Sequence, residues 1–469
     1  MSKFILFVSA IFALTGFKAF AQNGFDNYLK KDSLYRYNSS LKVLDSLLNT
    51  RTQNILSDTS FNNSFGKSEV FSLSQLLFAA VNNNPELTAM QTKIEASNSL
   101  AEAKTFLPDP MFEFELDDIM SDFNRVGMIN FFVSQMFPFP GKLALEKRSV
   151  LDAKAMMQSE RLSMAIEIMN MIKMNYFDLY LVNKKLQINY DNSLIMQTFL
   201  ASAEAQYMVG KGMQQEVFKS QIEMSRLQNE AYILKQQRKN IFSELTKLTK
   251  IMVDENTKIS FADIDTEYLM NDNSFRVNEV QNSRLIDYAF LHRPDIKTLN
   301  NKIIMNQTDL EMAKIERLPD FNLKLGYKIL PFEEKNAFAF MIGVNIPFAP
   351  WSSGKYDHAI KRNEIIIKST TDELSAKKND IRNEITTIVN NMTSLKETMK
   401  FYYGVQLPQT ENTMKSAQYS YETNMGSFLD LLDAYRMYQE SRIMYYESVT
   451  MYLKMIAELE KATGLNLKN

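Results

Sequence analysis

The feature that most constrains this chain is an internal repeat. Two stretches each contain a proline-led helix start, a Leu-Pro pair, two runs of alternating residues and a long helical pattern, in that order. The helix starts are Asn-Pro-Glu-Leu at residues 84–87 and Arg-Pro-Asp-Ile at residues 293–296. Such a period predicts two copies of one supersecondary unit, which we assign to residues 69–283 and 284–469.

The first residues predict export from the cytoplasm. Residues 1–21 combine Lys3, an apolar stretch and Ala19-Phe20-Ala21 before a cleavage point, which is the pattern of a secretory signal peptide. Residues 22–68 are polar and lack a sustained period, so we expect an extended or loosely ordered N-terminal arm. Because no later segment holds about 18 consecutive apolar residues, any membrane crossing is expected to use strands.

Composition excludes several classes of function. The absence of cysteine excludes a disulfide framework, thiolate chemistry and lipidation through an N-terminal Cys. The 53 basic residues nearly balance the 55 acidic residues, which argues against nucleic acid as a partner. Only His292 and His358 are present, and there is no Gly-rich phosphate loop or nucleophile elbow. We therefore expect no enzyme, no catalytic residue, no cofactor and no resident metal site.

Alternating apolar and polar residues predict four strands, at about residues 111–118, 126–137, 320–330 and 337–347. Each is close to the roughly 9 to 11 residues with which a tilted strand crosses a bilayer. The polar faces of the first and third strands carry charges of both signs, which predicts a wet pore without a clear ion preference. The predicted pore-lining residues are Glu113, Glu115, Asp117, Lys324 and Lys328.

Four strands cannot close a barrel alone, and lipid tolerates no unpaired sheet edge. We therefore expect several copies of the chain to pool their strands. The alternative explanation of the same pattern is a pair of soluble hairpins whose apolar faces pack on helices.

Two very long helices are expected after the strand pairs. One helical pattern runs from Lys142 to about Gln206 and another from Lys355 to about Ser420, so each predicts a rod about 100 Å long. The second pattern has a coiled-coil seam and contains Pro408, which is expected to kink the helix. A turn and a shorter returning helix follow each rod.

With these elements in place, the chain resembles the TolC-like family of outer-membrane efflux ducts. The resemblance covers residues 71–464 and rests on the order of the elements and on Tyr-Glu-Thr-Asn-Met-Gly-Ser-Phe-Leu-Asp-Leu-Leu-Asp-Ala at residues 421–434. It implies a mainly α fold with a transmembrane β part, in which three chains form a twelve-stranded β-barrel and a long α-helical barrel through the periplasm. Residues 135–142 (Gln-Met-Phe-Pro-Phe-Pro-Gly-Lys) are similar to the strand-to-helix junction of the heavy-metal efflux branch.

The resemblance also implies where the periplasmic entrance is closed, because residues 421–434 correspond to the family's tip. The residues implied in the gate are Tyr421, Asp430, Asp433, Glu216 and Tyr207, and the tip turns implied in adaptor docking contain Gly210, Gly212 and Gly426. Relatives carry an Arg in the tip and a Gly three residues after the Tyr, where this chain has Gly426 and Asn424. An Arg-centred latch is therefore not expected here.

The tip carboxylates have two possible roles. Repeated by threefold symmetry around a narrow opening, Asp430 and Asp433 would form an acidic ring that favours cations. The alternative is that both are solvated side chains near a helix start, where the helix dipole favours acids.

Together these predictions describe a passive exit duct of a tripartite efflux system in the outer membrane, extending into the periplasm. The resemblance implies a homotrimer, and its implied partners are a periplasmic adaptor, an inner-membrane transporter of the RND type and outer-membrane lipid. Two alternatives remain open: a type I protein-secretion duct of the same fold, and a secreted coiled-coil structural protein.

The chain also has 29 methionines, whose thioethers can bind soft metal ions. Several of them, such as Met169, Met392 and Met399, lie where helix packing would use methionine as a gap-filler. Metal, drug and protein substrates are therefore all left open.

Overall fold

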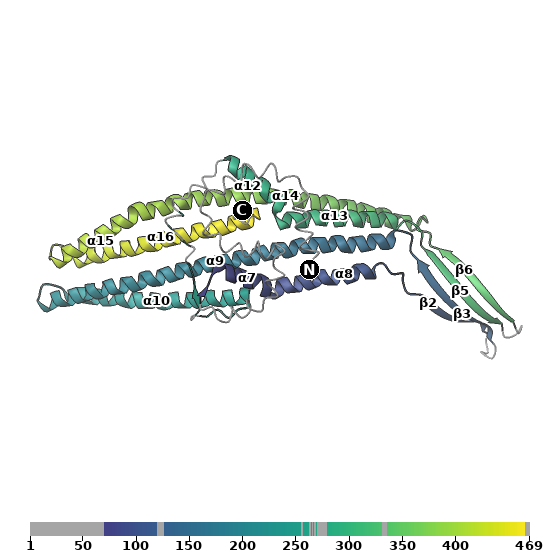
Figure 1. Cartoon of the computed structure of the whole chain (residues 1–469), viewed down its shortest axis with the longest axis horizontal. Coiled ribbons are helices and arrows are strands. Elements are labelled where there is room, and N and C mark those ends of the chain that lie inside the picture. Colours follow the sequence, from purple (N-terminus) through teal and green to yellow (C-terminus); the bar gives the residue numbers. More distant parts are fainter. Residues whose placement is uncertain are drawn as a thin grey trace. The chain divides into compact units, whose positions relative to one another are not determined.

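The described part of the chain is mostly helical and contains a four-stranded sheet (Figure 1). This computed structural model describes residues 70–119, 126–254, 257–261, 264, 266, 269, 279–330 and 335–464. The predicted signal peptide and N-terminal arm lie outside the described residues. The described residues form two compact units: those within Met1–Thr88, Met164–Arg293 and Asp380–Asn469 belong to unit 1, and those within Ala89–Ser163 and Pro294–Asn379 belong to unit 2.

Each compact unit takes segments from both predicted repeats. The long helices α9 (Lys142–Met208) and α14 (Ser353–Phe401) contribute residues to both units. The predicted boundary after residue 283 lies inside helix α12 (Glu279–His292). The assignment of two repeats therefore stays a prediction.

Unit 2 contains the sheet, together with most of helix α8 (Pro85–Ala103) and helix α13 (Pro294–Ile315). Its strands are β2 (Met111–Ile119), β3 (Val126–Phe137), β5 (Phe321–Leu330) and β6 (Lys335–Val344). They are antiparallel neighbours in the order β2-β3-β5-β6, so one hairpin from each half of the sequence lies beside the other. The predicted strands are thus present.

The strand register separates an apolar face from a polar face, because successive side chains of a strand point to opposite sides. On the apolar face Phe112 pairs with Val133, which is the partner of Leu325. That face is exposed in this chain, with Phe338 at 89%, Phe112 at 67% and Ile342 at 64%. Its other members include Phe114, Leu116, Ile129, Phe131, Leu323, Tyr327 and Phe340.

Strand β6 ends earlier than predicted. It stops at Val344 rather than at residue 347, because Val344 pairs with Phe321, the first residue of its partner strand. Asn345 then turns to Asp320: its N–H donates to the Asp320 carbonyl, and its side-chain oxygen accepts from the Asp320 N–H. The last alternating residues therefore follow the strand instead of extending it.

A carboxylate joins the strand-to-helix junctions of unit 2. Asp320 Oδ1 accepts the N–H of Phe139 at 2.8 Å and the ammonium of Lys142 at 2.7 Å. Lys142 also donates to the carbonyl of Leu318 at 3.1 Å. Together with Asn345, these bonds tie the ends of β3, α13 and β6 to the start of β5.

Unit 1 begins with a short strand and a capped helix. Strand β1 (Val70–Phe71) pairs in parallel with β4 (Lys258–Ile259). Helix α7 (Leu73–Asn83) starts with a capping box between Ser72 and Gln75, which satisfies two backbone donors of the helix start. Helix α8 then begins at a proline, whose missing N–H has no cost in the first turn.

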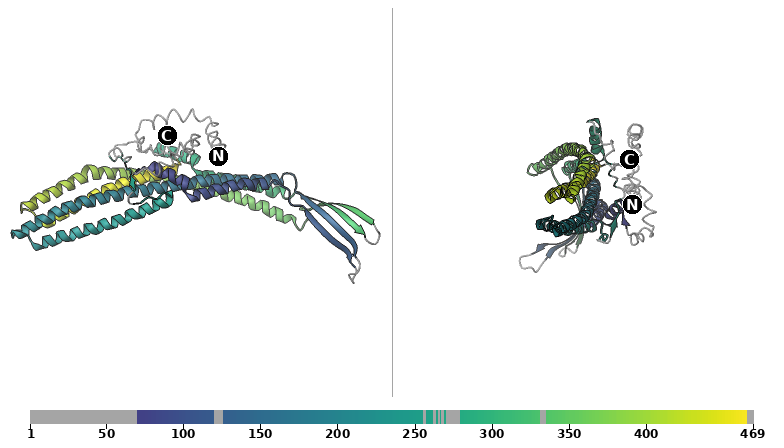
Figure 2. Two further views of the ribbon diagram at one scale, coloured as in Figure 1. Left: turned by 60° about the horizontal axis from the view of Figure 1, so that its bottom comes forward. Right: turned by 90° about the vertical axis from the view of Figure 1, so that its left-hand side faces the viewer.

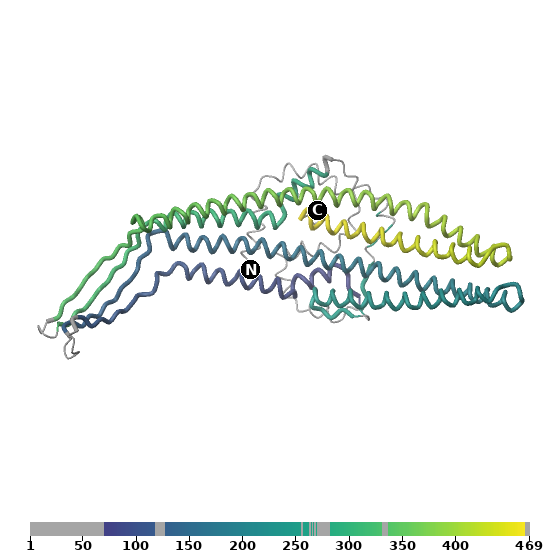
Figure 3. Tube along the Cα trace, turned by 180° about the vertical axis from the view of Figure 1, so that it is seen from behind, coloured from purple at the N-terminus to yellow at the C-terminus, as the bar shows by residue number. Residues whose placement is uncertain are grey.

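Two antiparallel helical hairpins form most of unit 1 (Figure 2). The first pairs α9 with α10 (Gln214–Thr249), and the second pairs α15 (Leu407–Glu422) with α16 (Phe428–Thr463). Their turns lie at the same end of the unit (Figure 3). In the described part of the chain, no helix is both long and apolar enough to cross a membrane.

The irregularity predicted at Pro408 is a π-helix, η3 (Tyr402–Gln406), placed between α14 and α15. Pro408 has no N–H with which to bond the carbonyl four residues earlier. The preceding turn widens, so that the N–H of Leu407 donates to the carbonyl of Tyr402, five residues back. The helical rod continues beyond this bulge to Glu422.

A ladder of ion pairs joins α9 to α16 within unit 1. Along α9 the paired residues alternate between acidic and basic, and α16 supplies the opposite sign at every position. The Lys185–Glu447 and Asp191–Arg442 pairs have N···O distances of 2.6 and 2.7 Å. The remaining pairs are Glu167–Lys461, Lys173–Glu460 and Asp178–Lys454.

Candidate functional site

The two hairpin turns of unit 1 have the same hydrogen-bonding pattern. In the first turn, the N–H groups of Lys211 and Gly212 both donate to the carbonyl of Gln206, at 2.9 and 3.0 Å. In the second turn, the N–H groups of Met425 and Gly426 both donate to the carbonyl of Ser420, at 2.8 and 3.0 Å. Tyr207, Gly212 and Glu216 match Tyr421, Gly426 and Asp430 in the sequence without a gap. This match therefore corresponds to one turn geometry used twice.

An added Cβ atom would have little space at the same position of both turns. A Cβ atom on Gly212 would lie 3.0 Å from the Cβ of Gln206, and one on Gly426 would lie 2.9 Å from the Cβ of Ser420. A long side chain such as arginine would begin inside this contact. The geometry is thus consistent with the absence of the Arg that relatives carry in the tip.

The presence of Asn424, where relatives carry a glycine, also has a backbone explanation. Gly210 has a φ of +72° and Asn424 a φ of +58° at the corresponding position of the second turn. Asparagine tolerates this left-handed conformation better than most residues with a side chain. Asn424 can therefore replace glycine without changing the turn.

Tyr421 and Glu216 connect the two hairpins near these turns. The Tyr421 hydroxyl donates to Glu216 Oε2 at 3.0 Å, and Gln206 Nε2 donates to the Tyr421 carbonyl at 3.2 Å. The Tyr421 side chain is only 3% exposed. Burial, and then the hydrogen bond and charge of Glu216, raise the pKa of the Tyr421 phenol. The phenol consequently stays protonated and remains a donor at physiological pH.

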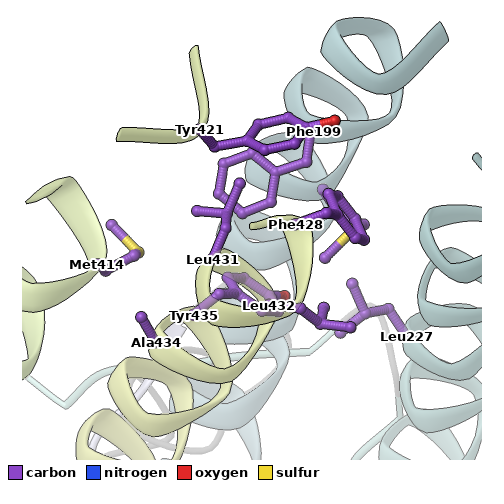
Figure 4. Close-up of a cluster of buried hydrophobic side chains, with 10 residues drawn as sticks. Phe199, Leu227, Met414, Tyr421, Phe428, Leu431, Leu432, Ala434 and Tyr435 are labelled. Carbon is purple, nitrogen blue, oxygen red and sulfur yellow. The ribbon is translucent and has the colours of Figure 1, made fainter. Parts of the chain in front are cut away.

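An apolar cluster surrounds Tyr421 (Figure 4). Its ring lies beside those of Phe199 and Phe428, and the Tyr421 and Phe428 centroids are 5.4 Å apart in an edge-on arrangement. The other buried members of the cluster are Met196, Leu227, Met414, Leu431, Leu432, Ala434 and Tyr435. Low exposure to water strengthens the polar link that this cluster encloses.

The other predicted gate residues do not join this link. Asp430 is exposed and lies in the first turn of α16, where Ser427 caps the helix by accepting the Asp430 N–H at 3.1 Å. The Ser427 hydroxyl in turn donates to the Asp430 carboxylate at 2.7 Å. Asp433 is exposed, and Tyr207 is 47% exposed. These three side chains face solvent in a single chain.

A buried carboxylate forms a second polar connection between the hairpins. Glu223 of α10, at 1% exposure, accepts bonds from Arg226 at 2.8 Å and from Arg436 of α16 at 3.0 Å. Arg226 also donates to Gln439 at 3.0 Å. Burial alone would raise the pKa of the Glu223 carboxyl, but the bonds from the two guanidinium groups outweigh it and hold the pKa below its usual value.

The predicted pore-lining residues share the polar face of the sheet. Lys324 forms an ion pair with Glu113, and its ammonium lies 4.3 Å from the centroid of the Phe132 ring. Asn130, which pairs with Glu115 across the strands, donates to that carboxylate at 3.3 Å. Asp117 and Lys328 lie on the same face by register. Charges from both strand pairs are thus brought to one side.

Sequence reasoning missed several residues that contribute to the inter-hairpin connection. Gln206, Arg226, Glu223 and Arg436 received no role from their spacing. Gln206 could have been found, because it immediately precedes Tyr207 in the matched segment and therefore corresponds to Ser420. Glu223 and Arg226 could also have been found as a pair, because they are three residues apart on α10. Arg436 had no such signal, since it comes from α16. Among the described residues, no group of three or more His, Cys, Asp or Glu side chains could hold a metal ion.

The fold matches solved outer-membrane proteins. CusC superimposes with a TM-score of 0.69 at 15% identity, over 83% of this chain and 91% of CusC. The outer-membrane channel OprN gives 0.69 at 12% identity, over 86% and 92%, and the open state of Neisseria gonorrhoeae MtrE gives 0.68 at 13%, over 84% and 89%. No protein-family model and no curated protein matches the chain.

At these identities the similarity shows the fold alone. The fold is that of the TolC-like outer-membrane channels, which confirms the resemblance predicted from the sequence. The number of chains in the assembly, the closure of a barrel and the roles of individual residues stay predictions.

Proposed function

We propose that this chain is the exit duct of a tripartite efflux system, located in the outer membrane and extending into the periplasm. The observation that carries the proposal is the exposed apolar face of the four-stranded sheet, on a chain with the fold of outer-membrane channels. Water disfavours so large an apolar surface, whereas lipid or other protein would cover it at no such cost. Substrates would pass through the duct without any chemical change, so no residue has a catalytic role.

Closure of the sheet requires further copies of the chain. Strands β2 and β6 are the two edges of the described sheet, and an open edge cannot be exposed to lipid because its backbone groups would lack partners. Three copies would bring twelve strands together, so we propose a homotrimer. The face with Glu113, Glu115, Asp117, Lys324 and Lys328 would then line a wet pore.

The paired turns of unit 1 are the proposed docking place for a periplasmic adaptor. The turns with Gly210, Gly212 and Gly426 have matching geometry, so one kind of adaptor element could engage both. An inner-membrane transporter, of the RND type in this proposal, would supply the energy. Type I protein secretion is the alternative use of the same fold.

We further propose that the periplasmic end is gated. The Tyr421–Glu216 bond would hold the two hairpins together in the closed duct, with Gln206 as a second link. The exposed Asp430, Asp433 and Tyr207 would face the opening of the trimer. Threefold repetition of the carboxylates would produce an acidic ring that attracts cations.

The first experiment determines the assembly. Detergent-extracted protein is examined by size-exclusion chromatography with light scattering, and then reconstituted in planar bilayers. A trimer with discrete conductance is expected. The variant Asp430→Ala with Asp433→Ala should conduct more than wild type, whereas Glu422→Ala, an exposed change outside the proposed ring, should not. A water-soluble monomer without conductance would exclude the duct and favour the secreted structural protein.

A further inference from the structure

A cavity of about 320 Å³ lies in unit 1 between α9, α16 and the segment that follows β4. Helix α9 lines it with Tyr180, Asn183 and Lys184, α16 lines it with Tyr446, and Phe261 comes just after β4. A cavity of about 150 Å³ holds one benzene molecule. The cavity of unit 1 therefore has room for a small ligand with about two fused rings.

Lys184 is the charged group of this cavity. Its ammonium lies 5.7 Å from the centroid of the Tyr180 ring and 5.3 Å from that of Tyr446. Ring faces attract a cation, but they do not neutralise its charge. In the part of the chain that the structure describes, no side chain forms an ion pair or a hydrogen bond with Lys184. The next residue, Lys185, instead pairs with Glu447 at 2.6 Å, so the ladder between α9 and α16 leaves Lys184 out.

The Tyr180 hydroxyl is a second polar group without a partner among the described residues. The side chain is only 5% exposed, and a buried phenol normally has a hydrogen-bond partner. Tyr176, one turn earlier on α9, has the ordinary arrangement, because its hydroxyl donates to the carbonyl of Ser260 at 2.6 Å. Burial, and then the neighbouring Tyr446 and Tyr445, raise the pKa of the Tyr180 phenol. The hydroxyl therefore stays protonated and can donate to a ligand.

Aromatic rings form the walls of the cavity. The Tyr180 ring lies 5.6 Å from that of Phe261 at an interplanar angle of 59°, and 6.4 Å from that of Tyr446 at 70°. Angled rings of this kind are suited to pack against a further ring. Asn183 and Gln187 add amide groups to the lining. Apolar walls with a few polar groups are typical of sites that bind small molecules.

We propose that this cavity binds a small aromatic carboxylate, an organic anion with one or two fused rings. Its carboxylate would accept hydrogen bonds from the Lys184 ammonium and the Tyr180 hydroxyl, and its rings would lie against Phe261 and Tyr446. Lys184 is the charged member of the lining, so an anion would neutralise it. Such a ligand would join α9, α16 and the segment after β4, and would stabilise the folded chain by binding it.

The proposed site is separate from the hairpin turns. Tyr180 lies about 40 Å along α9 from Met208, where that helix ends. A ligand in the cavity therefore has no contact with the Tyr421–Glu216 link. The proposal goes beyond the proposed duct and does not depend on it.

The test measures the binding of 2-naphthoate by full-length protein in a non-ionic detergent. Equilibrium dialysis, with protein-free detergent as the blank, gives the bound ligand per chain, and saturable binding is expected. Lys184→Gln should weaken it about tenfold or more, because a hydrogen bond to a charged group contributes that much. Tyr180→Phe keeps the ring and should weaken it several-fold. The matched control is Lys235→Gln, which changes an exposed lysine of α10 and should bind as wild type does.

Two further probes separate the contribution of the charge from that of the rings. 2-Naphthylmethanol has the same rings without the carboxylate, and hexanoate has the carboxylate without rings. Both should bind much more weakly than 2-naphthoate. Equal binding of 2-naphthylmethanol, or tighter binding of the cationic 2-naphthylmethylammonium, would contradict the role of Lys184.

Absence of saturable binding to wild type would overturn the site, as would unchanged binding by both Lys184→Gln and Tyr180→Phe. Thermal unfolding without ligand checks that these variants fold, and Lys184→Arg, which keeps the charge, should recover most of the binding lost in Lys184→Gln. Conductance of the same samples in planar bilayers tests the duct separately. A conducting channel without binding would remove the site and leave the duct, whereas binding without conductance would do the reverse.

Discussion

At the residue scale, the Tyr421 hydroxyl is the group that most directly joins the two hairpins near their turns. Tyr421→Phe keeps the ring packed against Phe428 but removes the bond to Glu216, leaving a partly buried carboxylate with one donor fewer. A hydrogen bond to a charged group contributes about 1.5–3 kcal/mol. We expect larger single-channel conductance in planar bilayers for this variant. Tyr419→Phe, on the same helix and 67% exposed, is the control, and equal conductance of both variants would remove Tyr421 from the gate.

The glycine of the second turn gives a second prediction at this scale. Gly426→Ala would place a Cβ 2.9 Å from that of Ser420, between backbone segments that cannot separate without opening the turn. Amide hydrogen exchange near residues 420–427 should therefore become faster. Gly354→Ala is the control, because nothing lies within 4 Å of its added Cβ. Unchanged exchange in Gly426→Ala would show that the turn adapts without opening.

The sequence allowed only part of this site to be predicted. Tyr421 was found through the resemblance of residues 421–434 to the family's tip, and Glu216 because it corresponds to Asp430 in the first turn. The structure brings Tyr421 and Glu216 within hydrogen-bond distance. Glu223 and Arg436 could not be found in this way, since they meet only when α10 packs on α16 in the observed register. Whether any of them controls conduction depends on the assembly, which a single chain does not contain.

At the scale of elements, the cluster around Glu223 should make the contact between α10 and α16 sensitive to acid. The pKa of the Glu223 carboxyl is lowered in the folded chain. The stability that this carboxylate contributes is therefore complete above the usual glutamate pKa of about 4.3, and it is lost as pH falls through the lowered pKa of the folded chain. Glu223→Gln should lower the thermal midpoint at pH 7 and have a shrinking effect below about pH 4. Exposed Glu422→Gln is the control. An equal effect of Glu223→Gln at pH 7 and pH 3 would contradict this account.

The ladder between α9 and α16 predicts a charge-swap effect. Its alternating signs oppose a sliding of one helix past the other, because a shift by one position would bring like charges together. Lys185→Glu should destabilise the chain by about 1 kcal/mol through repulsion by Glu447. Combining it with Glu447→Lys should restore most of that loss in thermal unfolding. If the double variant did not recover stability, the Lys185–Glu447 ion pair would not fix the register between α9 and α16.

Most elements were predictable because their signals are local. Alternation identified the four strands, and Pro85 and Pro294 marked helix starts that the structure contains. The pairing of β1 with β4 was missed, because strands of two residues are too short to show a period. The end of β6 was misplaced because the register with β5, rather than the alternation itself, decides where pairing stops.

At the scale of the whole molecule, the exposed apolar face of the sheet decides the proposed location. Phe338 and Ala337 are neighbours on β6 whose side chains point to opposite faces. Phe338→Glu would place a charge against lipid in the proposed trimer, whereas Ala337→Glu would place the same charge on the polar face, opposite Lys328. A charge on the lipid side of a barrel strand is unfavourable, while changes on the pore side are tolerated.

The two variants therefore test the membrane proposal by placing the same side chain, glutamate, on opposite faces of the sheet. Phe338→Glu should reduce the amount of folded protein in isolated outer membranes and lower the yield of heat-resistant trimer. Ala337→Glu should assemble at the wild-type level and change only the ion preference of the channel. If both variants assembled equally well, the 89% exposed ring of Phe338 would not face lipid, and the sheet would have to be covered by protein instead.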